Sequence, residues 1–576
     1  MSDASFTSPF HLLAREATLG VATHWVLKRY EPRTYATVLA LISTVPAVVI
    51  AFSSPLQAFS TTTTAVLACY ATYVTALSLS VLVYRLSPSH PLAKFPGPLL
   101  YRVSNLCALS MAWNGTQHVV LRELHDIYGP ILRVGPNKLS VCSIDGIQTI
   151  LGAGGVPKGR TYEARQDPNA PQNLLVLTGK AHAARRRLWN RGMSPEALRE
   201  YERFLLRRAT QLFRKLEGQK ETVDMAEWIS FFAFDFMGDM AFGGGFEMLQ
   251  DPQGDRDILR NHIKNAMRTV AIISQVPWGA STLRTFPVFS RDLLAMRAFG
   301  VKFATQRVKS GSQVKDLWYH LTDEAKHEKT TPPMSDVVAD GMLAIIAGAD
   351  TVATATLSVI YYVLSTADGK YMTALQQEVD EFFARSDADL FAAAREADTL
   401  PFLNACINEA LRMQPPAPTS GTRRVVDGAP KVVNGQLIPS GTDVYVPPYA
   451  FHRDPAHFSP HTNTFWPERW LLSTPAALAA LGLPAPAPSS VVHNADAFIP
   501  FSAGPANCAG RALAWQEMRV VLALLVHGFD VRLATGAERW EAELRDHFVM
   551  NRGALPVTLE RRRGSASLDA LLDGAA

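Results

Sequence analysis

Charged residues are missing from one long stretch near the start of the chain. From Thr34 to Tyr84 there are 51 consecutive residues without Asp, Glu, Lys or Arg. Two apolar segments lie within it, at 35–52 and 65–84, and neither has the amphipathic face of a helix in a soluble core. A helix needs about 20 apolar residues to cross a bilayer. The pattern predicts a membrane anchor over 34–86 with two transmembrane helices, of which the first is shorter, contains a proline and is the weaker candidate.

Basic residues flank this anchor at both ends. Those before the first apolar segment and after the second are Lys28, Arg29, Arg33, Arg85, Lys94 and Arg102. A helical hairpin would put both flanks in the cytosol, as the positive-inside rule favours. The N-terminal segment, residues 1–33, lacks the basic start and apolar core of a secretory signal. We therefore expect no cleavage there.

A proline-rich segment follows the anchor. Residues 87–98 contain four prolines, each of which fixes its own φ and biases the preceding residue toward an extended form. We expect a stiff stalk that separates the anchor from one large domain at 99–560. Residues 561–576, which begin with three arginines, are predicted to be a flexible tail.

Beyond residue 99 the pattern is mostly helical. Apolar residues recur at helical spacing over 197–217, 223–242, 336–366, 371–384 and 511–528. Shorter segments with strand-like patterns and turn signals lie at 130–142 and 421–446. The predicted fold class is mainly α with small β-sheets (α+β), preceded by the N-terminal transmembrane helices.

Composition narrows the class of protein. Of 576 residues 19% are charged, but all 108 of these lie outside the uncharged stretch, so the other 525 residues are about 21% charged, close to a soluble protein. Lys and Arg exceed Asp and Glu by 56 − 52 = +4, which gives no reason to expect nucleic-acid binding. The five cysteines are too few and too scattered for a disulfide scaffold.

The sequence around one cysteine suits a metal ligand. In Phe501-Ser-Ala-Gly504-Pro-Ala-Asn-Cys508-Ala-Gly510, the glycines allow a sharp turn and a close approach to a flat ligand. Cys508 comes just before a predicted helix, whose N-terminal dipole and free N–H groups lower a thiol pKa. A thiolate is a ligand for heme iron. The alternative is an inert buried cysteine, but the other four cysteines lack such surroundings entirely.

Three further patterns carry chemical information. Glu409 and Arg412 share one helix face among apolar residues, and Arg469, in Pro-Glu-Arg-Trp, could complete their network because a guanidinium offers several donors in a fixed fork. Asp350 and Thr351 lie side by side in an apolar helix, where both need partners or a function. The alternative for Glu409 and Arg412 is a solvated ion pair on the helix surface. The alternative for Asp350 and Thr351 is a notch in the helix with a hydrogen-bonded Asp.

These four patterns, in this order and spacing, resemble the cytochrome P450 family of heme-thiolate monooxygenases. The resemblance covers residues from about 90 to 560, and each motif is modest alone while their joint occurrence is specific. The anchor resembles the microsomal, reductase-dependent type. The phrases His452-Arg-Asp-Pro455 and Gly504-Pro-Ala-Asn-Cys508 are similar to fungal members of secondary metabolism.

The resemblance implies a role for each motif. Cys508 would be the axial thiolate of heme b, with Phe501 packed beside the heme and Gly504 and Gly510 shaping the loop.

Asp350 and Thr351 would be the catalytic pair that delivers protons during oxygen activation. Glu409, Arg412 and Arg469 would be a structural triad on the proximal side of the heme.

The two heme propionates would need cations. His182 and Arg186, at i and i+4, match the helix of the family that reaches a propionate, and Arg423 matches a second contact, with Arg424 as a near competitor. The family usually has Arg or His two positions before the cysteine, where this chain has Ala506. We infer that Arg186, Arg423 and His182 bind the propionates in place of the missing cation.

The reaction that the resemblance implies is insertion of one oxygen atom from O2 into a lipophilic small molecule such as a terpenoid. Electrons would come from NADPH through a partner reductase, with cytochrome b5 as a second donor, and the domain would face the cytosol from the endoplasmic reticulum membrane. One alternative is an isomerase or lyase of the same fold without O2 activation, against which the intact Asp350-Thr351 pair argues. The other is a non-catalytic membrane heme-binding protein. Asn114 begins a glycosylation sequon that we expect to be unused.

Overall fold

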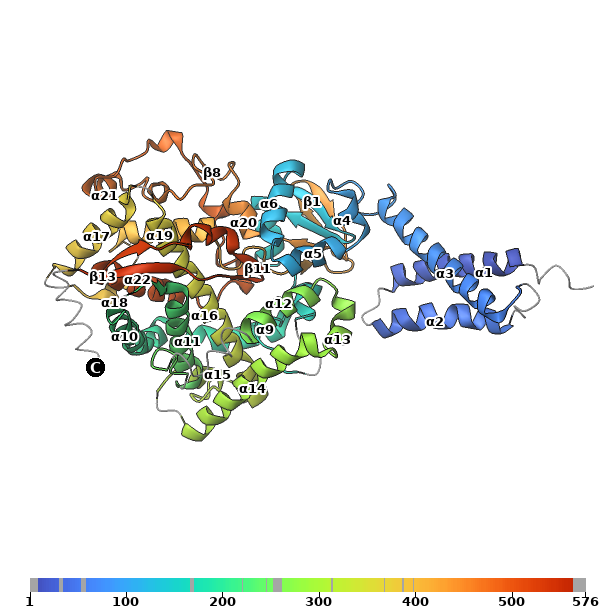
Figure 1. Ribbon diagram of the computed structural model, residues 1–576, viewed down its shortest axis with the longest axis horizontal. Coiled ribbons are helices and arrows are strands. Elements are labelled where there is room, and N and C mark those ends of the chain that lie inside the picture. The colour runs from blue at the N-terminus through green and yellow to red at the C-terminus, as the bar shows by residue number, and fades with distance from the viewer. Residues whose placement is uncertain are drawn as a thin grey trace, which may run out of the picture.

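The chain folds into a bundle of three N-terminal helices that projects from one large, mostly helical domain (Figure 1). The structure is a computed structural model that describes residues 9–562 except for 31–34, 53–58, 166–169, 220, 245, 252–261, 312–313, 367, 386–387 and 397. The predicted fold class, mainly helical with small sheets, is confirmed.

The two apolar segments form α2 (Tyr35–Phe52) and α3 (Thr62–Leu86). Both are long and apolar enough to cross a membrane, and little of either is buried within the protein. Thr61 begins α3, since its hydroxyl accepts a hydrogen bond from the Thr64 N–H. The sequence pattern did not predict α1 (Pro9–Arg29), which lies within the N-terminal segment and packs along α3.

The segment expected to be an extended stalk differs from that prediction. Residues 87–95 form turns, and the side chains of Leu92 and Phe95 are buried in a core that they share with Val141. The Arg133 N–H donates to the Pro96 carbonyl at 2.6 Å. The prolines do not extend the chain because two large apolar side chains gain more from burial than an exposed stalk would allow.

The first half of the domain supplies short helices around a small sheet and longer helices around the main core. These helices are α4 (Leu99–Val103), α5 (Leu106–Asn114), α6 (Gln117–Tyr128), α7 (Ile144–Gly146), α8 (Arg160–Glu163), α9 (Gly179–Gly192), α10 (Pro195–Glu217), α11 (Met225–Phe242), α12 (Lys264–Ile273), α13 (Ala280–Leu283), α14 (Pro287–Ser310) and α15 (Leu317–Leu321). A π-helical turn, Ile147–Leu151, continues α7.

The second half of the domain begins with its longest helix, α16, which runs through the core. The helices are α16 (Met334–Leu364), α17 (Lys370–Phe383), α18 (Leu390–Arg395), α19 (Pro401–Met413), α20 (Pro448–His452), α21 (Pro475–Ala480) and α22 (Arg511–Gly528). By length and composition α16 could also cross a membrane, but 67% of its most apolar window is buried among α11, α19 and α22. A Cβ at Gly348 would lie 2.5 Å from the Met237 sulfur, so this glycine lets α11 approach α16 closely.

The strands form small sheets at the edges of the helical core. A four-stranded sheet has the order β1-β2-β7-β4 and a three-stranded sheet the order β10-β13-β3, and three hairpins pair β5 with β6, β8 with β9 and β11 with β12. The strands are β1 (Ile131–Gly135), β2 (Lys138–Val141), β3 (Val223–Asp224), β4 (Arg423–Arg424), β5 (Lys431–Val433), β6 (Gln436–Ile438), β7 (Asp443–Tyr445), β8 (Phe458–Ser459), β9 (Val492–His493), β10 (Phe529–Leu533), β11 (Arg545–His547), β12 (Val549–Asn551) and β13 (Pro556–Arg561).

The start of the predicted tail is structured. Arg561 is the last residue of β13 and pairs with Phe529 of β10, and the Arg562 guanidinium binds Asp380 at 2.6 Å. Arg561 and Arg562 therefore belong to the domain and not to the tail, because strand pairing and an ion pair hold them. The rest of the tail lies outside the described residues.

Candidate active site

One cavity of about 300 Å³ lies between the middle of α16 and the N-terminal end of α22. It is lined mainly by apolar side chains, which come from distant parts of the chain. The sequence-predicted residues that line it are Thr351, Cys508, Phe501, Gly510, His182, Arg186 and Arg423. Asp350, Gly504 and the Glu409 triad lie outside its lining.

The cysteine loop is built around two glycines with different roles. Gly504 has φ +68°, and a Cβ there would lie 1.9 Å from the Leu151 carbonyl oxygen, so only glycine fits. The Cys508 N–H donates to the Phe501 carbonyl at 3.0 Å, which closes the loop before α22. A Cβ at Gly510 would meet no protein atom within 4 Å, and Gly510 lines the cavity. The loop therefore leaves open space beside the thiol.

The pKa of Cys508 differs from the sequence-based expectation. Burial raises the pKa of its thiol, although a hydrogen bond from the Gly510 backbone and the charges of Arg186 and Arg511 act in the opposite direction. The effect of desolvation on the thiol pKa is larger than the opposite effect of the helix N-terminus. The helix alone therefore does not make Cys508 a thiolate. A bound metal ion would remove the proton outright.

Arg186 connects α9 to the cysteine loop. Its Nη1 donates to the Asn507 carbonyl at 2.6 Å, its Nη2 donates to Asn507 Oδ1 at 2.7 Å, and its Nε donates to Asn190 Oδ1 at 2.8 Å. The residue before the cysteine is thus held by two hydrogen bonds from one guanidinium. Sequence reasoning placed Arg186 beside the loop only through its resemblance to a propionate ligand.

A buried carboxylate fixes the orientation of α9. Asp340 of α16 accepts hydrogen bonds from Arg185 Nη1 at 2.9 Å, Trp189 Nε1 at 3.1 Å and the Leu174 N–H at 2.8 Å. Because Arg185 points to α16, its neighbour Arg186 points to the cysteine loop. The two neighbouring arginines of α9 therefore bind different elements. Arg185 binds α16, and Arg186 binds the cysteine loop.

Four basic side chains meet at one edge of the cavity. His182, Arg186 and Arg423 were predicted, whereas Lys158 was missed. Lys158 reaches the edge because it forms a β-bridge with Arg423, and its Nζ donates to the carbonyls of Leu174 and Leu177. An isolated lysine outside a recognised motif gives no signal in the sequence, and only this bridge identifies it.

The basic edge has no acidic partner among the described residues. Lys158, Arg186 and Arg423 form no ion pair with a carboxylate of the described chain. Burial, followed by the charges of Arg423 and Arg186, lowers the pKa of Lys158 to about 7. Burial and the three cations likewise lower the pKa of His182 to about 4. This concentration of positive charge calls for an anionic ligand.

The cavity fits a heme. A planar macrocycle with two carboxylates needs a soft ligand on one face, space beside it and cations at one edge. Cys508, the gap at Gly510 and the basic edge supply these three features. The one carboxyl in the lining is Glu517, and burial raises its pKa well above the ordinary value, so it does not neutralise the basic edge.

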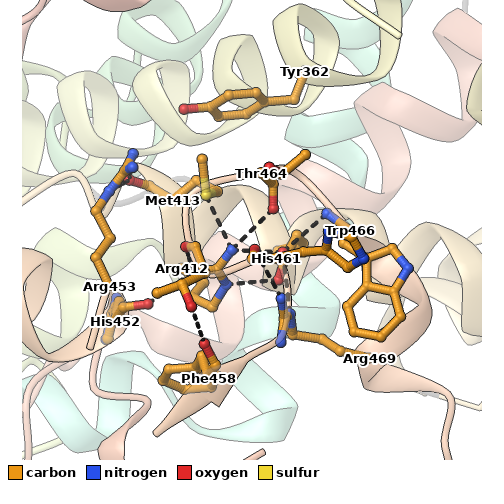
Figure 2. Close-up of polar contacts among 12 residues, drawn as sticks. Tyr362, Arg412, Met413, His452, Arg453, Phe458, His461, Thr464, Trp466 and Arg469 are labelled. Atoms are coloured by element: carbon orange, nitrogen blue, oxygen red, sulfur yellow. Dashed lines mark hydrogen bonds and ion pairs between the residues drawn. The ribbon is translucent and has the colours of Figure 1, made fainter. Parts of the chain in front are cut away.

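The predicted triad is a fully buried network, and Figure 2 shows its two arginines, Arg412 and Arg469, among the groups that they contact. Glu409 accepts from Arg412 Nη2 at 2.7 Å and Nε at 2.9 Å, and from Arg469 Nε at 3.3 Å. Arg412 Nη1 also donates to the carbonyls of His452 and Thr462. Burial would raise the pKa of Glu409, but Arg412 and Arg469 hold it below its ordinary value. The network ties α19 to the segment that follows β8.

The acid and the alcohol of α16 face different spaces. Thr351 lines the cavity of Cys508, and its Oγ1 donates to the Ala347 carbonyl at 2.6 Å. Asp350 lines a second cavity of about 570 Å³ on another side of α16. The structure therefore does not place the two side chains in one pocket, because neighbouring helix positions are about 100° apart.

The second cavity contains a partner that the sequence analysis missed. Arg552, after β12, lies 3.5 Å from Asp350 Oδ1 through its Nη1, and its Nη2 donates to Ser230 Oγ at 2.7 Å. Burial raises the pKa of Asp350, and Arg552 opposes this shift. No motif marks Arg552, since it is about 200 residues away in the sequence and meets Asp350 only through the fold.

Comparisons with known proteins agree with this geometry. The family described as Cytochrome P450 matches residues 95–558. Cytochrome P450 67 of Uromyces fabae is 31% identical over 80% of this chain and 84% of its own. Tryprostatin B 6-hydroxylase of Aspergillus fumigatus is 31% identical over 85% and 84%. Cytochrome P450 monooxygenase FCK2 of Fusarium pseudograminearum is 30% identical over 84% and 85%.

The first prediction concerns Arg186. Arg186→Ala removes two hydrogen bonds to Asn507 and one cation from the basic edge, so we expect the purified protein to retain much less heme while its circular dichroism stays that of a folded protein. Asn507→Ala, which removes only the side-chain acceptor, should cause a smaller loss. Arg187→Ala on the same helix, an exposed residue paired with Glu328, is the matched control. Full heme content in Arg186→Ala would contradict the assignment.

The second prediction concerns Glu409. Glu409→Gln keeps the volume but leaves two buried guanidinium groups without a counter-charge, which should cost about 3–5 kcal/mol of unfolding free energy. Because the folded-state pKa of Glu409 lies below its unfolded value, its contribution is present at neutral pH and lost as the pH falls. Urea unfolding at several pH values should show that the variant has lost this part of the acid sensitivity. An unchanged unfolding free energy at neutral pH would refute the structural role.

Proposed function

The chain belongs to the cytochrome P450 family and is a cytochrome P450 monooxygenase, and we propose that it inserts one oxygen atom from O2 into a lipophilic small molecule of secondary metabolism, such as a terpenoid. The observation that carries this proposal is the placement of the Cys508 thiol at the base of a cavity with largely apolar walls. The relative named Tryprostatin B 6-hydroxylase supports oxidation of a small organic molecule.

The wall of the cavity favours an apolar substrate. Leu174, Leu343, Met237, Val352 and Phe548 line the space above the cysteine loop. Pockets with mostly apolar walls and a few polar groups bind lipophilic ligands and orient them through those polar groups. The few polar groups that could orient a substrate include the hydroxyls of Tyr162 and Ser420.

The residues at the base and edge would hold the heme. Cys508 would ligate the iron, Gly510 would leave space for the ring, and Phe501 would pack beside it. Lys158, Arg423, Arg186 and His182 would meet the propionates. When bound through a thiolate, heme supplies the activation of O2, because the thiolate donates electron density that favours O–O cleavage.

Proton supply would use both sides of α16. Asp350 faces the second cavity, where burial keeps the pKa of its carboxyl raised and Arg552 fixes its position. A carboxyl of raised pKa in a large cavity that also contains polar groups can take a proton from water and pass it on. Thr351 offers a hydroxyl to the substrate cavity one residue further along the helix.

We infer that electrons come from NADPH through a partner reductase, with cytochrome b5 as a second donor. The enzyme would be anchored in the endoplasmic reticulum membrane with its domain in the cytosol. Support comes from the apolar helices α2 and α3 and from the basic residues at the cytosolic end of α3, which include Arg85.

The third prediction tests the ligand and the reaction together. In membranes that contain the reduced protein, CO should give the Soret shift typical of thiolate-ligated heme, and Cys508→Ser should abolish it. Cys406→Ser, a buried cysteine far from the cavity lining, is the control. With NADPH, a reductase and ¹⁸O2, the product should carry one ¹⁸O atom. A thiolate-type spectrum that survives Cys508→Ser would overturn the proposal, and so would a product without ¹⁸O.

The fourth prediction concerns proton supply. Asp350→Asn should lower the rate of product formation by about 10²-fold, the usual contribution of a positioned proton donor. The CO spectrum and the heme content should stay unchanged, and NADPH should still be consumed without product. Asp368→Asn, on an exposed turn, is the matched control. If Asp350→Asn forms product at the rate of the control and with the same solvent isotope effect, Asp350 has no role in proton delivery.

A further inference from the structure

Helix α1 is in contact with α3 along its length. A Cβ at Gly20 would lie 2.6 Å from the Tyr73 carbonyl oxygen, so the two backbones approach closely there. Further along, the Tyr73 hydroxyl donates to Thr23 Oγ1 at 2.8 Å. Small residues that allow close backbone contact, and hydroxyl groups that bond across the interface, are features of helix pairs in membranes.

The contacts also show that α1 and α3 run in the same direction. His24 Nδ1 is 2.8 Å from Ser80 Oγ, and Lys28 Nζ is 3.9 Å from the centre of the Tyr84 ring. As the chain advances along α1 from 23 to 28, its partners advance along α3 from 73 to 84. Any depth that α3 occupies in a bilayer is therefore also occupied by α1.

The length of α1 suits this position. Its 21 residues, at about 1.5 Å each, extend about 31 Å, close to the thickness of the hydrocarbon core of a bilayer. Helix α2 is also attached to this pair, because the Tyr70 hydroxyl of α3 donates to the Ser43 carbonyl of α2 at 2.6 Å. Figure 1 shows the three helices as one bundle outside the domain.

The polar and apolar faces of α1 have the arrangement of a membrane helix. Glu16, Thr23 and His24 are buried against α3, while Val21 and Trp25 are exposed. Ionisable side chains within membranes face neighbouring helices in this way, and apolar ones face lipid. In a soluble bundle the exposed face would be polar instead.

The two ends of α1 differ in a way that sets its orientation. Lys28 lies over the rings of both Trp25 and Tyr84, next to Arg29 and Arg85 at the ends of α1 and α3. Aromatic rings are common at both surfaces of a membrane, and an excess of basic groups marks the cytosolic one. Arg15 is exposed near the other end, within about two turns of the N-terminus, where a long side chain can reach the opposite headgroups.

We propose that α1 is a third transmembrane helix, so that the anchor is a three-helix bundle whose partner on all outer faces is membrane lipid. The N-terminus then lies in the lumen, opposite the catalytic domain. This differs from the two-helix hairpin predicted by the sequence, in which the N-terminus is cytosolic. The proposal rests on the anchoring proposed above, but not on heme binding or activity.

The test uses the full chain with a short N-terminal extension that carries an Asn-Ser-Thr glycosylation site about 20 residues before Met1, and a C-terminal epitope. In sealed microsomes the extension should be glycosylated, as shown by a mobility shift that an endoglycosidase reverses. Protease added outside the vesicles should destroy the C-terminal epitope and leave the glycosylated fragment intact. The CO spectrum of the same membranes reports separately whether the domain is folded and holds heme.

The matched control is the same fusion without residues 2–31. With α1 removed, two spans remain, so the extension should stay unglycosylated and accessible to protease while the C-terminal epitope is unchanged. The proposal is overturned if the extension of the full chain is unglycosylated and accessible to protease in vesicles whose domain is cytosolic. It is also overturned if alkaline carbonate extracts the full chain from the membrane, because then none of the helices spans it.

Discussion

The buried carboxylate of Glu409 is the contact on which the packing of α19 against the segment after β8 depends. It is bound by two guanidinium groups, a backbone N–H and an indole N–H, and no part of it reaches solvent. The two arginines in turn donate to the carbonyls of Thr462 and Pro460, in the segment between α20 and α21. One charge therefore fixes α19 against an irregular stretch of the chain. The cysteine loop follows this stretch after α21 and β9, and Glu409 does not line the cavity of the thiol.

The basic edge of the cavity differs from the Glu409 network, because its positive charges have no negative partner among the described residues. Three cations and a histidine are held together by the Lys158–Arg423 bridge and by α9, and no carboxylate of the described residues balances them. Their mutual repulsion costs stability until an anion binds, so heme binding and folding of this region should reinforce each other. Ala506 adds no cation beside the cysteine, and Arg186 holds the neighbouring residue, Asn507, through its backbone carbonyl and its side chain.

Much of the fold and site could be predicted from the sequence because the signals are local. The helix periodicity predicted α10, α11, α16, α17 and α22 within a few residues, and the cysteine loop carried its own glycines. The failures have one cause, since each depends on contacts between distant segments. Lys158 and Arg552 meet their partners only in the folded chain, and the contact of α1 with α3 joins segments about 50 residues apart. The proline-rich segment forms turns because Leu92 and Phe95 are buried against residues such as Val141, which are distant in the sequence.

The placement of Asp350 and Thr351 in two different cavities beside α16 has a consequence for how such an enzyme can change over time. If Asp350 takes up protons as proposed, water reaches it from the cavity of Arg552 and Ser230, whereas the substrate cavity has a largely different lining that shares Val549 with it. Substitutions in the substrate wall away from Val549 would then leave that water supply intact. A lineage could acquire new substrates, including bulky ones that exclude all solvent from the space above the thiol, without rebuilding the route by which protons arrive.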